Sequence, residues 1–355
     1  MTKAMKALKS FVYSSKSLSY VVNRVIDWKI LNLSPRSHSL GVTYLNNKLT
    51  DGAGAQLQRI YGIYAISRFL NVPYIHSPLI SLDYQGLNAL ENNSSDQEIV
   101  PKYNKVFQIH SDMELPKDFT VHEIHNFNLR IFEQLRKEAE ASKTFILARI
   151  LLPYGVTDSY PRAYQFVRDV SPFSFFRESS PVIRIAIHVR RGELFVVESN
   201  RMLPNSYYIA VAQKIRIVLD ELNLNYVFEL HTEVPAKAFT VTPSHHGILN
   251  RISNSITIDP RSSRLEEFDS IPNLEKFINS DPIETIQRMA SADILVMSHS
   301  SFSYLGAILN RNGIIIYHKF WHTMLKDWLR ADDSGHFSKR IFLKRFKEKI
   351  GSMKS

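Results

Sequence analysis

A regular alternation of short apolar strands with helices, from residue 183 onwards, constrains the fold more than any other feature of this sequence. At 183–189, Ile and Val occupy every second position, which is the period of a β-strand. The same pattern predicts helices at 208–222, from Asp281 onwards and at 302–309, and strands at 226–230, 256–258, 294–297 and 313–317. Alternating units of this length predict a parallel sheet with helices on both faces.

The first half of the chain shows a weaker version of this pattern. It predicts strands at 40–45 and 72–75, helices at 57–65 and 122–142, and a polar loop at 83–118. The stretch 171–181 is the best linker candidate, because it holds two prolines and four serines. Since 355 residues exceed the usual size of one hydrophobic core, we expect two α/β domains. Their predicted bounds are 41–178 and 179–318, with a basic helical arm at 1–40 and a basic helical tail at 319–355.

The formal net charge of +10 is carried by the two ends of the chain. Residues 1–29 have a net charge of +5 (six Lys and Arg against Asp27), and residues 336–355 have +6 (seven against Glu348). The body between them is therefore close to neutral, and we predict no specific nucleic-acid partner. The basic ends are compatible with helices packed on the body and with peripheral contact to an anionic membrane.

The composition excludes several chemistries. The chain has no cysteine, which rules out disulfides, thiolate metal sites and a cysteine nucleophile. It has no apolar run of membrane-spanning length and no signal-peptide pattern, so we expect a cytoplasmic protein. His122 and His125 lie on the predicted 122–142 helix, but their spacing is not that of a His-Glu-x-x-His zinc site. We therefore predict no metal site.

Polar residues follow three of the predicted strands, at the position where open parallel sheets bind ligands. Arg190 and Arg191 offer the fork of donors that suits a phosphate, although surface ion pairs would use the same residues. Residues 231–233 (His-Thr-Glu) suit a base or a ribose, and loop polarity is also common at such places. Residues 298–303 place clustered serines between a buried strand and a helix, which suits an anion.

Glycines at 52 and 54 open the first helix of the N-terminal half. They would allow a ligand to approach the backbone closely, although Gly-x-Gly is also a frequent turn. The loop lacks the full dinucleotide-binding fingerprint. The sequence also has no GxxxxGK[ST] motif, which argues against a P-loop nucleotidase.

Three ordered motifs together resemble those of GDP-fucose-dependent fucosyltransferases. They are Gly52-Ala53-Gly54-Ala55-Gln56, His188-Val189-Arg190-Arg191-Gly192-Glu193 and Ser300-Ser301-Phe302-Ser303-Tyr304. The chain is most similar to the α-1,2-fucosyltransferase family, and it also resembles α-1,6- and O-fucosyltransferases over about 41–76 and 182–321. It departs from them at Glu193, where the family motif has aspartate, and at Thr285, where some members have aspartate.

The resemblance implies an α/β, GT-B-like fold, in which two Rossmann-like domains with parallel sheets face each other across a cleft. It implies inverting transfer of fucose from GDP-fucose to a hydroxyl of a glycan or polysaccharide, without a cofactor or a metal. The missing Asp-x-Asp motif agrees with this, because arginines can neutralise the departing diphosphate in place of a metal. The residues expected to bind the donor are Gly52, Ala53, Gly54, Gln56, His188, Arg190, Arg191, His231, Thr232, Glu233, Thr285, Ser300, Ser301 and Phe302.

Arg190 is also expected to act in catalysis, by stabilising the leaving diphosphate. The acceptor hydroxyl must lose a proton, and Glu193, Glu198 and Asp51 are the candidate general bases, although a dissociative reaction would need none. Another nucleotide sugar on the same scaffold is an alternative, as is a protein that only binds a sugar nucleotide. A polyanion- or nucleic-acid-binding protein is the alternative from a different class.

Overall fold

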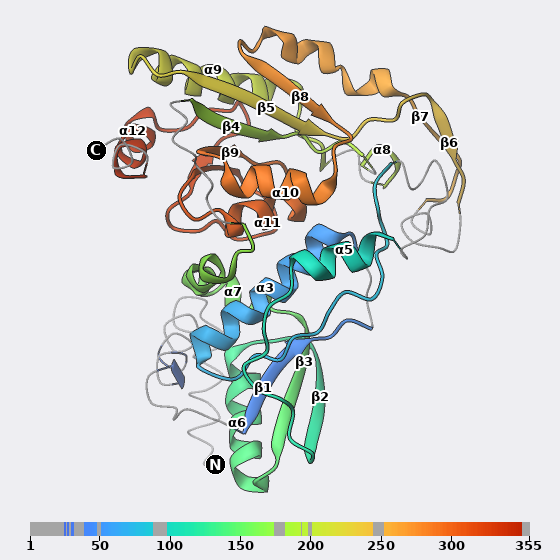
Figure 1. Cartoon of the computed structure of the whole chain (residues 1–355), viewed down its shortest axis with the longest axis vertical. Helices are drawn as coiled ribbons and strands as arrows, with labels where there is room; N and C mark the ends of the chain where they lie inside the picture. The colour runs from blue at the N-terminus through green and yellow to red at the C-terminus, as the bar shows by residue number, and fades with distance from the viewer. Residues whose placement is uncertain are drawn as a thin grey trace, which may run out of the picture.

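The computed structural model describes residues 39–47, 51–87, 98–173, 182–192, 194–197, 201–243 and 252–349, together with Val25, Asp27, Ile30 and Leu31. Most of the predicted N-terminal arm and of the 171–181 linker lies outside the described residues, as do Glu193 and Glu198. Within the described residues, two parallel sheets lie at opposite ends of the molecule, and helices pack between and around them (Figure 1).

The sheet of the N-terminal half has the strand order β1-β3-β2, with all strands parallel. Its strands are β1 (Leu40–Tyr44), β2 (Phe119–Asn126) and β3 (Phe145–Leu152). The helices of this half are α3 (Ala53–Leu70), α5 (Ile99–Val106), α6 (Leu129–Ser142), the short α7 (Tyr154–Thr157) and the 3-10 helix η1 (Pro161–Val170). All of β1 is buried, which explains why its sequence is a short apolar run.

The sheet of the C-terminal half has the strand order β11-β10-β9-β4-β5-β8, again parallel throughout. Its strands are β4 (Ile183–His188), β5 (Tyr226–Thr232), β8 (Leu274–Ile278), β9 (Ile294–Val296), β10 (Ile314–His318) and β11 (Leu329–Ala331). Helices of this half are α8 (Leu194–Val197), α9 (Asn205–Glu221), α10 (Pro282–Ser291), α11 (Ser301–Leu309) and α12 (Lys339–Lys349), with 3-10 helices η4 (Pro260–Ser263) and η5 (Leu265–Ser270).

Helices cover both faces of the C-terminal sheet, because successive strand residues point to opposite sides. Ile185 and Ile187 of β4 belong to one core, which contains the apolar residues of α9 and α12. Ala186, between them, belongs to the other core, which contains those of α10 and α11. The prediction of a parallel sheet with helices on both faces is confirmed.

Helix α3 joins the two halves. It is buried along most of its length, because it packs on β1 and η1 on the N-terminal side and on α11 on the C-terminal side. One hydrophobic core therefore runs from Val42 of β1 through α3 to Leu305 of α11 and Leu295 of β9. The predicted α/β class, with two parallel sheets in separate halves, is confirmed by this arrangement (Figure 1).

The predicted helix at 122–142 is partly wrong. Residues 122–126 belong to strand β2, and α6 starts at Leu129. β2 is an edge strand whose side chains are mostly exposed. Its sequence therefore lacks the clear alternation of apolar and polar residues that identifies a half-buried strand. His122 and His125 therefore lie on a strand and not on one helix face.

Other elements also differ from the sequence prediction. The strand predicted at 256–258 exists as β7 (Ile256–Ile258), but it pairs antiparallel with β6 (Phe239–Val241), outside the parallel sheet. The edge strand β8 was not predicted, because its sequence Leu-Glu-Lys-Phe-Ile is half exposed and lacks an apolar run. The predicted loop at 83–118 contains α5, and the stretch 72–75 forms a bridge from Tyr74 to Val42 instead of a strand.

The start of α10 agrees with the sequence, whereas the stretch predicted as a helical tail at 319–355 also contains β11, which pairs with β10 in the C-terminal sheet. The side chain of Asp281 caps α10 by accepting hydrogen bonds from the backbone N–H groups of Ile283 (2.8 Å) and Glu284 (3.1 Å). In the tail, α12 buries Phe342 and Phe346 in the core and exposes most of its basic side chains. None of the helices in the described ranges is long and apolar enough to cross a membrane.

Candidate functional site

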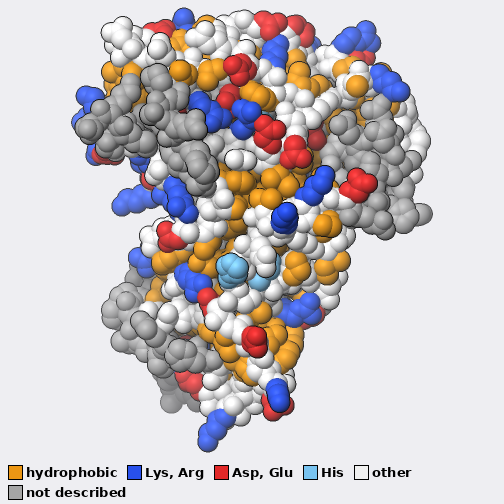
Figure 2. All heavy atoms as spheres, viewed as in Figure 1, with side chains coloured by type: hydrophobic (Ala, Val, Ile, Leu, Met, Phe, Trp, Pro, Cys, Tyr) orange, Lys and Arg blue, Asp and Glu red, His pale blue; other side chains and the backbone are white. Residues whose placement is uncertain are grey.

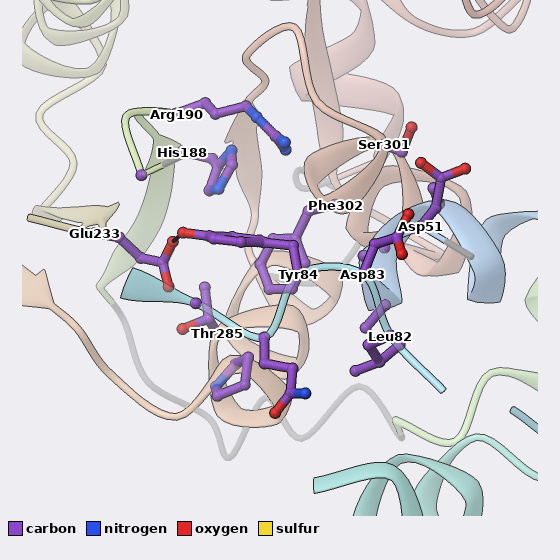
Figure 3. Close-up of a pocket in the computed structure, with 18 of the residues that line it drawn as sticks. Asp51, Leu82, Asp83, Tyr84, His188, Arg190, Glu233, Thr285, Ser301 and Phe302 are labelled. Carbon is purple, nitrogen blue, oxygen red and sulfur yellow. Dashed lines mark hydrogen bonds between the residues drawn. The ribbon is translucent and has the colours of Figure 1, made fainter. Parts of the chain in front are cut away.

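A cavity of about 580 Å³ lies between the two halves. Its walls come from the carboxyl ends of β4 and β5, the first turns of α3, α10 and α11, and the segment 82–86 (Figure 3). Most of the residues that the motifs singled out line it: Asp51, Gly52, Ala53, Gly54, His188, Arg190, Arg191, His231, Thr232, Glu233, Thr285, Ser301 and Phe302. The fold therefore brings three motifs that are distant in sequence to one pocket.

Arg190 follows β4 and points toward the start of α11 (Figure 3). Its Nη1 donates a hydrogen bond to Oγ of Ser300. Ser300 is fully buried and caps α11, because its Oγ also accepts a hydrogen bond from the backbone N–H of Phe302 (3.1 Å). The guanidinium is thus fixed beside a helix N-terminus, where the backbone N–H groups favour an anion.

Arg191 behaves differently from its neighbour. Its guanidinium donates to Oδ1 of Asn205 and, through Nη1, to the backbone carbonyl of Arg190 (2.8 Å). Asn205 in turn donates to the carbonyls of Ser263 and Arg264, both at 3.1 Å. Burial lowers the pKa of the Arg191 guanidinium. Arg191 lines the pocket, but its hydrogen bonds hold the turn after β4 together, so we assign it a structural role.

His188 is the last residue of β4, two positions before Arg190, and its side chain is buried. Its Nδ1 lies 2.7 Å from Oγ of Ser298, and its ring packs on Phe302 with centroids 5.5 Å apart. Burial, followed by the positive charge of Arg190, lowers its pKa well below the ordinary value. His188 is therefore a neutral group in the wall of the pocket at physiological pH.

Glu233 and Tyr84 connect the two halves across the pocket (Figure 3). The Tyr84 hydroxyl, from the N-terminal half, donates to Oε2 of Glu233 at the end of β5 (2.7 Å). Gly192 has a φ of +43°, and a Cβ there would stand 2.7 Å from this carboxylate oxygen and 2.8 Å from the Tyr84 hydroxyl. Burial raises the pKa of Glu233, although Tyr84 and Arg190 oppose the shift. A carboxylate is thus held at this end of the pocket with little space around it.

Gln56 and the polar residues at the end of β5 contact other parts of the protein. Gln56 lies behind the pocket wall and donates to the carbonyls of Asp51 (2.8 Å) and Ser81 (2.7 Å), which holds the glycine loop in shape. Thr232 donates to the carbonyl of Val189 (2.7 Å). His231 stacks on Phe277, with ring centroids 5.1 Å apart. Their predicted contacts with a donor stay predictions.

Asp51 is the general-base candidate that the described residues include. It lines the pocket, and its Oδ2 accepts a hydrogen bond from Nη2 of Arg59 (2.5 Å). Glu193 and Glu198 lie outside the described residues, so their predicted role as a base has no structural account. The ion pair with Arg59 fixes the Asp51 carboxylate at the start of α3.

Several pocket residues were missed by the sequence analysis. They are Arg59, Tyr84, Tyr154, Arg201 and Trp321. The guanidinium of Arg201 lies 4.2 Å from the ring centre of Trp321, whose side chain is exposed at the rim. Arg59 could have been noticed, because it lies in the helix that the glycine motif opens. The others sit in loops or in a short helix and carry no spacing signal.

The described residues contain no group of three or more His, Asp or Glu side chains placed to hold a metal ion. His122 forms a contact with Glu138 (3.2 Å), whereas His125 lines the pocket. On the face drawn in Figure 2, the Lys and Arg side chains of the described residues are interspersed with Asp and Glu side chains.

The chain matches no protein-family model and no curated protein sequence. Among solved structures, E. coli heptosyltransferase WaaC with ADP is 10% identical, with a TM-score of 0.36 over 88% of this chain and 98% of that chain. A mutant of Arabidopsis thaliana FUT1 in complex with GDP is 10% identical, with a TM-score of 0.36 over 86% and 75%. POFUT1 in complex with GDP is 10% identical, with a TM-score of 0.37 over 79% and 96%. Likenesses this distant leave the fold and the site to be argued from the residues of this chain.

Proposed function

We propose that this chain is a glycosyltransferase that uses a nucleotide sugar, with GDP-fucose as its donor. The observation that carries the proposal is the fixed guanidinium of Arg190 beside the N-terminal end of α11 at the pocket wall. Both groups favour negative charge, so together they suit a diphosphate. Fucose as the transferred sugar is supported by the three ordered motifs, which resemble those of GDP-fucose-dependent enzymes.

In the proposed reaction, the bond between the anomeric carbon and the β-phosphate oxygen breaks, and its electron pair stays on the leaving GDP. The acceptor oxygen attacks the anomeric carbon from the opposite face, which inverts its configuration. The proton of the acceptor hydroxyl passes to a general base, for which Asp51 is the described candidate. Arg190 stabilises the charge that grows on the diphosphate, so this step needs no metal.

Glu233 supports guanine as the base of the donor. Guanine presents N1–H and N2–H₂ side by side, and a carboxylate can accept both hydrogen bonds, whereas adenine and uracil lack such a pair of donors. Glu233 lines the pocket directly after the carboxyl end of β5. Open parallel sheets bind ligands at this position. Its hydrogen bond from Tyr84 would then be shared with the base or opened by it.

The test is a panel of sugar nucleotides with GDP, ADP, UDP and dTDP leaving groups, monitored for nucleotide release with and without EDTA. We expect turnover of GDP-fucose that EDTA leaves unchanged. Loss of activity with EDTA would contradict the metal-independent reaction. A protein that binds none of the four nucleoside diphosphates in calorimetry would contradict the proposed function as a whole.

A second sugar nucleotide on the same scaffold is favoured by Thr285. This residue stands where some relatives have aspartate, and its hydroxyl donates to the backbone carbonyl of Asp281 (3.0 Å). It therefore offers no carboxylate to a base, and specificity for guanine depends on Glu233. Tighter binding of ADP or UDP than of GDP in the same panel would favour this alternative.

We also propose peripheral contact with an anionic membrane through the basic ends, of which α12 is described. Most of its Lys and Arg side chains are exposed, as such a contact requires. Sedimentation with anionic and with neutral vesicles at two salt concentrations tests this. Equal sedimentation with both kinds of vesicle would contradict it.

A further inference from the structure

An ion pair between Asp51 and Arg59 is built into the pocket wall. Nη2 of Arg59 lies 2.5 Å from Oδ2 of Asp51, and the side chains are 7% and 25% exposed. Asp51 lies two residues before α3, next to its N-cap Gly52, and Arg59 lies in the second turn of the helix. Both residues line the pocket.

Arg59 keeps its charge in this buried position. Burial alone would lower the pKa of its guanidinium, but the neighbouring Tyr154, Asp51 and Tyr44 outweigh burial and raise it above the ordinary value. Asp51 forms an ion pair with this charge, so loss of Asp51 would leave a buried guanidinium without that carboxylate.

The pair lies close to the N-terminal end of α11, because a Cβ on Gly54, at the start of α3, would stand 2.5 Å from Cα of Phe302 in α11. His322 is buried there, and its Nε2 lies 2.9 Å from Oγ of Ser301, the first residue of α11. Burial, and then the charges of Arg59 and Arg201, lower the pKa of His322 to about 3. The proposed diphosphate position, between Arg190 and α11, and the Asp51 carboxylate are therefore neighbours in one pocket.

We propose that Arg59 is a positioning residue that compensates the Asp51 carboxylate, so that a nucleoside diphosphate can bind beside the general base. This inference rests on the proposed function. An anionic donor and a carboxylate repel each other more strongly in a protein pocket than in bulk water. Arg59 weakens this repulsion and orients Asp51 through their ion pair.

Calorimetry with GDP and with guanosine, which has no phosphate, tests the proposal. R59Q should weaken GDP binding by about tenfold or more, while guanosine affinity changes by less than about twofold. R59K keeps the charge and should restore most of the GDP affinity. R68Q is the matched control, because Arg68 lies on the same helix, is paired with Asp112 at 2.5 Å and lies away from the pocket. It should leave both affinities unchanged.

A double-mutant cycle separates charge compensation from a general structural role. D51N should bind GDP at least as tightly as the wild type, and D51N/R59Q should bind it at least about fivefold more tightly than R59Q. Fucosyl transfer should stay impaired in both variants that lack the Asp51 carboxylate. The D51N arm tests the idea even where R59Q does not fold, since weaker GDP binding by D51N would overturn it.

Several outcomes would overturn the inference. Wild-type GDP affinity in R59Q would do so, as would equal losses of GDP and guanosine affinity, or a double variant no better than R59Q. An R59Q variant with an unchanged GDP affinity and a raised KM for the acceptor would place Arg59 at the acceptor instead. In all of these cases the wild type still binds GDP, whereas failure of the wild type to bind any nucleoside diphosphate would contradict the proposed function itself.

Discussion

Gly54, at the start of α3, lies directly against Phe302, at the start of α11. A Cβ on Gly54 would stand 2.5 Å from Cα and 2.7 Å from the backbone nitrogen of Phe302, which is closer than side chains approach a backbone. The N-terminal ends of the two helices can therefore meet at the pocket only with glycine at this position. The partial positive charges of both helix ends would therefore act on an anion bound between them.

The first prediction concerns this contact. G54A forces α3 away from α11, and overpacking of this kind costs about 1–3 kcal/mol. We expect a melting temperature lower by a few degrees, together with weaker GDP binding. G52A is the control for stability, because a Cβ on Gly52 would meet the Tyr84 carbonyl oxygen at an ordinary 3.6 Å. A G54A variant with wild-type melting and GDP affinity would contradict the importance of the contact.

The second prediction separates the two arginines after β4. R190A removes the guanidinium beside α11, so turnover should fall by about 100-fold to 1,000-fold, as when a donor to a developing oxyanion is lost. Its melting temperature should change little. R191Q should do the opposite and lower the melting temperature, because the hydrogen bonds to Asn205 and to the Arg190 carbonyl are weakened. Nucleotide-release kinetics and thermal melting of both variants check this, and similar behaviour of the two would contradict the assignment.

The sequence predicts those parts of the site that follow from regular structure. Arg190 and Ser301 could be identified, because the carboxyl ends of buried parallel strands meet at one edge of a sheet and such strands have clear apolar runs. The apolar residues of β4 and β9 predict these two buried strands, and Asp281 predicts the start of α10. Both adjacent arginines line the pocket, but which of them is held by a hydrogen bond to Asn205 depends on a distant residue that no local pattern reveals.

The parts that could not be predicted depend on contacts between the halves. Tyr84 reaches Glu233 across 149 positions of sequence, and it comes from a loop without periodicity. Most side chains of the edge strands β2 and β8 are exposed, so their sequences lack the apolar runs that identify buried strands. The ion pair of Asp51 with Arg59 spans eight residues, but its position in a pocket wall follows only from the packing of α3 on α11.

The third prediction concerns Glu233, whose pKa burial raises. A carboxyl group with a raised pKa in the folded state holds its proton more strongly there than in the unfolded chain, so its contribution to stability is lost as pH rises through the folded pKa. E233Q removes this titration and keeps an oxygen that can accept the Tyr84 hydrogen bond. We expect the variant to gain stability relative to the wild type as pH rises from 4 to 7, measured by thermal melting. A constant difference over this range would contradict the raised pKa.

The same variant should lose affinity for guanine nucleotides. An amide in place of the carboxylate presents one acceptor and one donor, so it cannot accept both guanine hydrogen bonds. We expect GDP affinity to fall by about tenfold or more in calorimetry, with little change in the affinity for inorganic pyrophosphate. If E233Q weakened the binding of GDP and of pyrophosphate equally, Glu233 would act on the phosphates. That result would contradict its proposed role in binding the base.

The last prediction concerns His322, whose pKa is lowered to about 3, mainly by burial. The unfolded chain therefore binds more protons than the folded protein between the ordinary histidine pKa of about 6.5 and pH 3. The stability contributed by the neutral side chain is present above pH 6.5 and is lost as pH falls through this window. H322N removes the titration, so the stability difference between wild type and variant should shrink by about 1.4 kcal/mol for each pH unit below 6.5.

Denaturant unfolding between pH 7 and 4.5 measures this difference. H336N, at an exposed histidine, serves as the control. Parallel pH profiles for wild type and H322N would show that His322 becomes protonated without unfolding, and would contradict the neutral pair that it forms with Ser301.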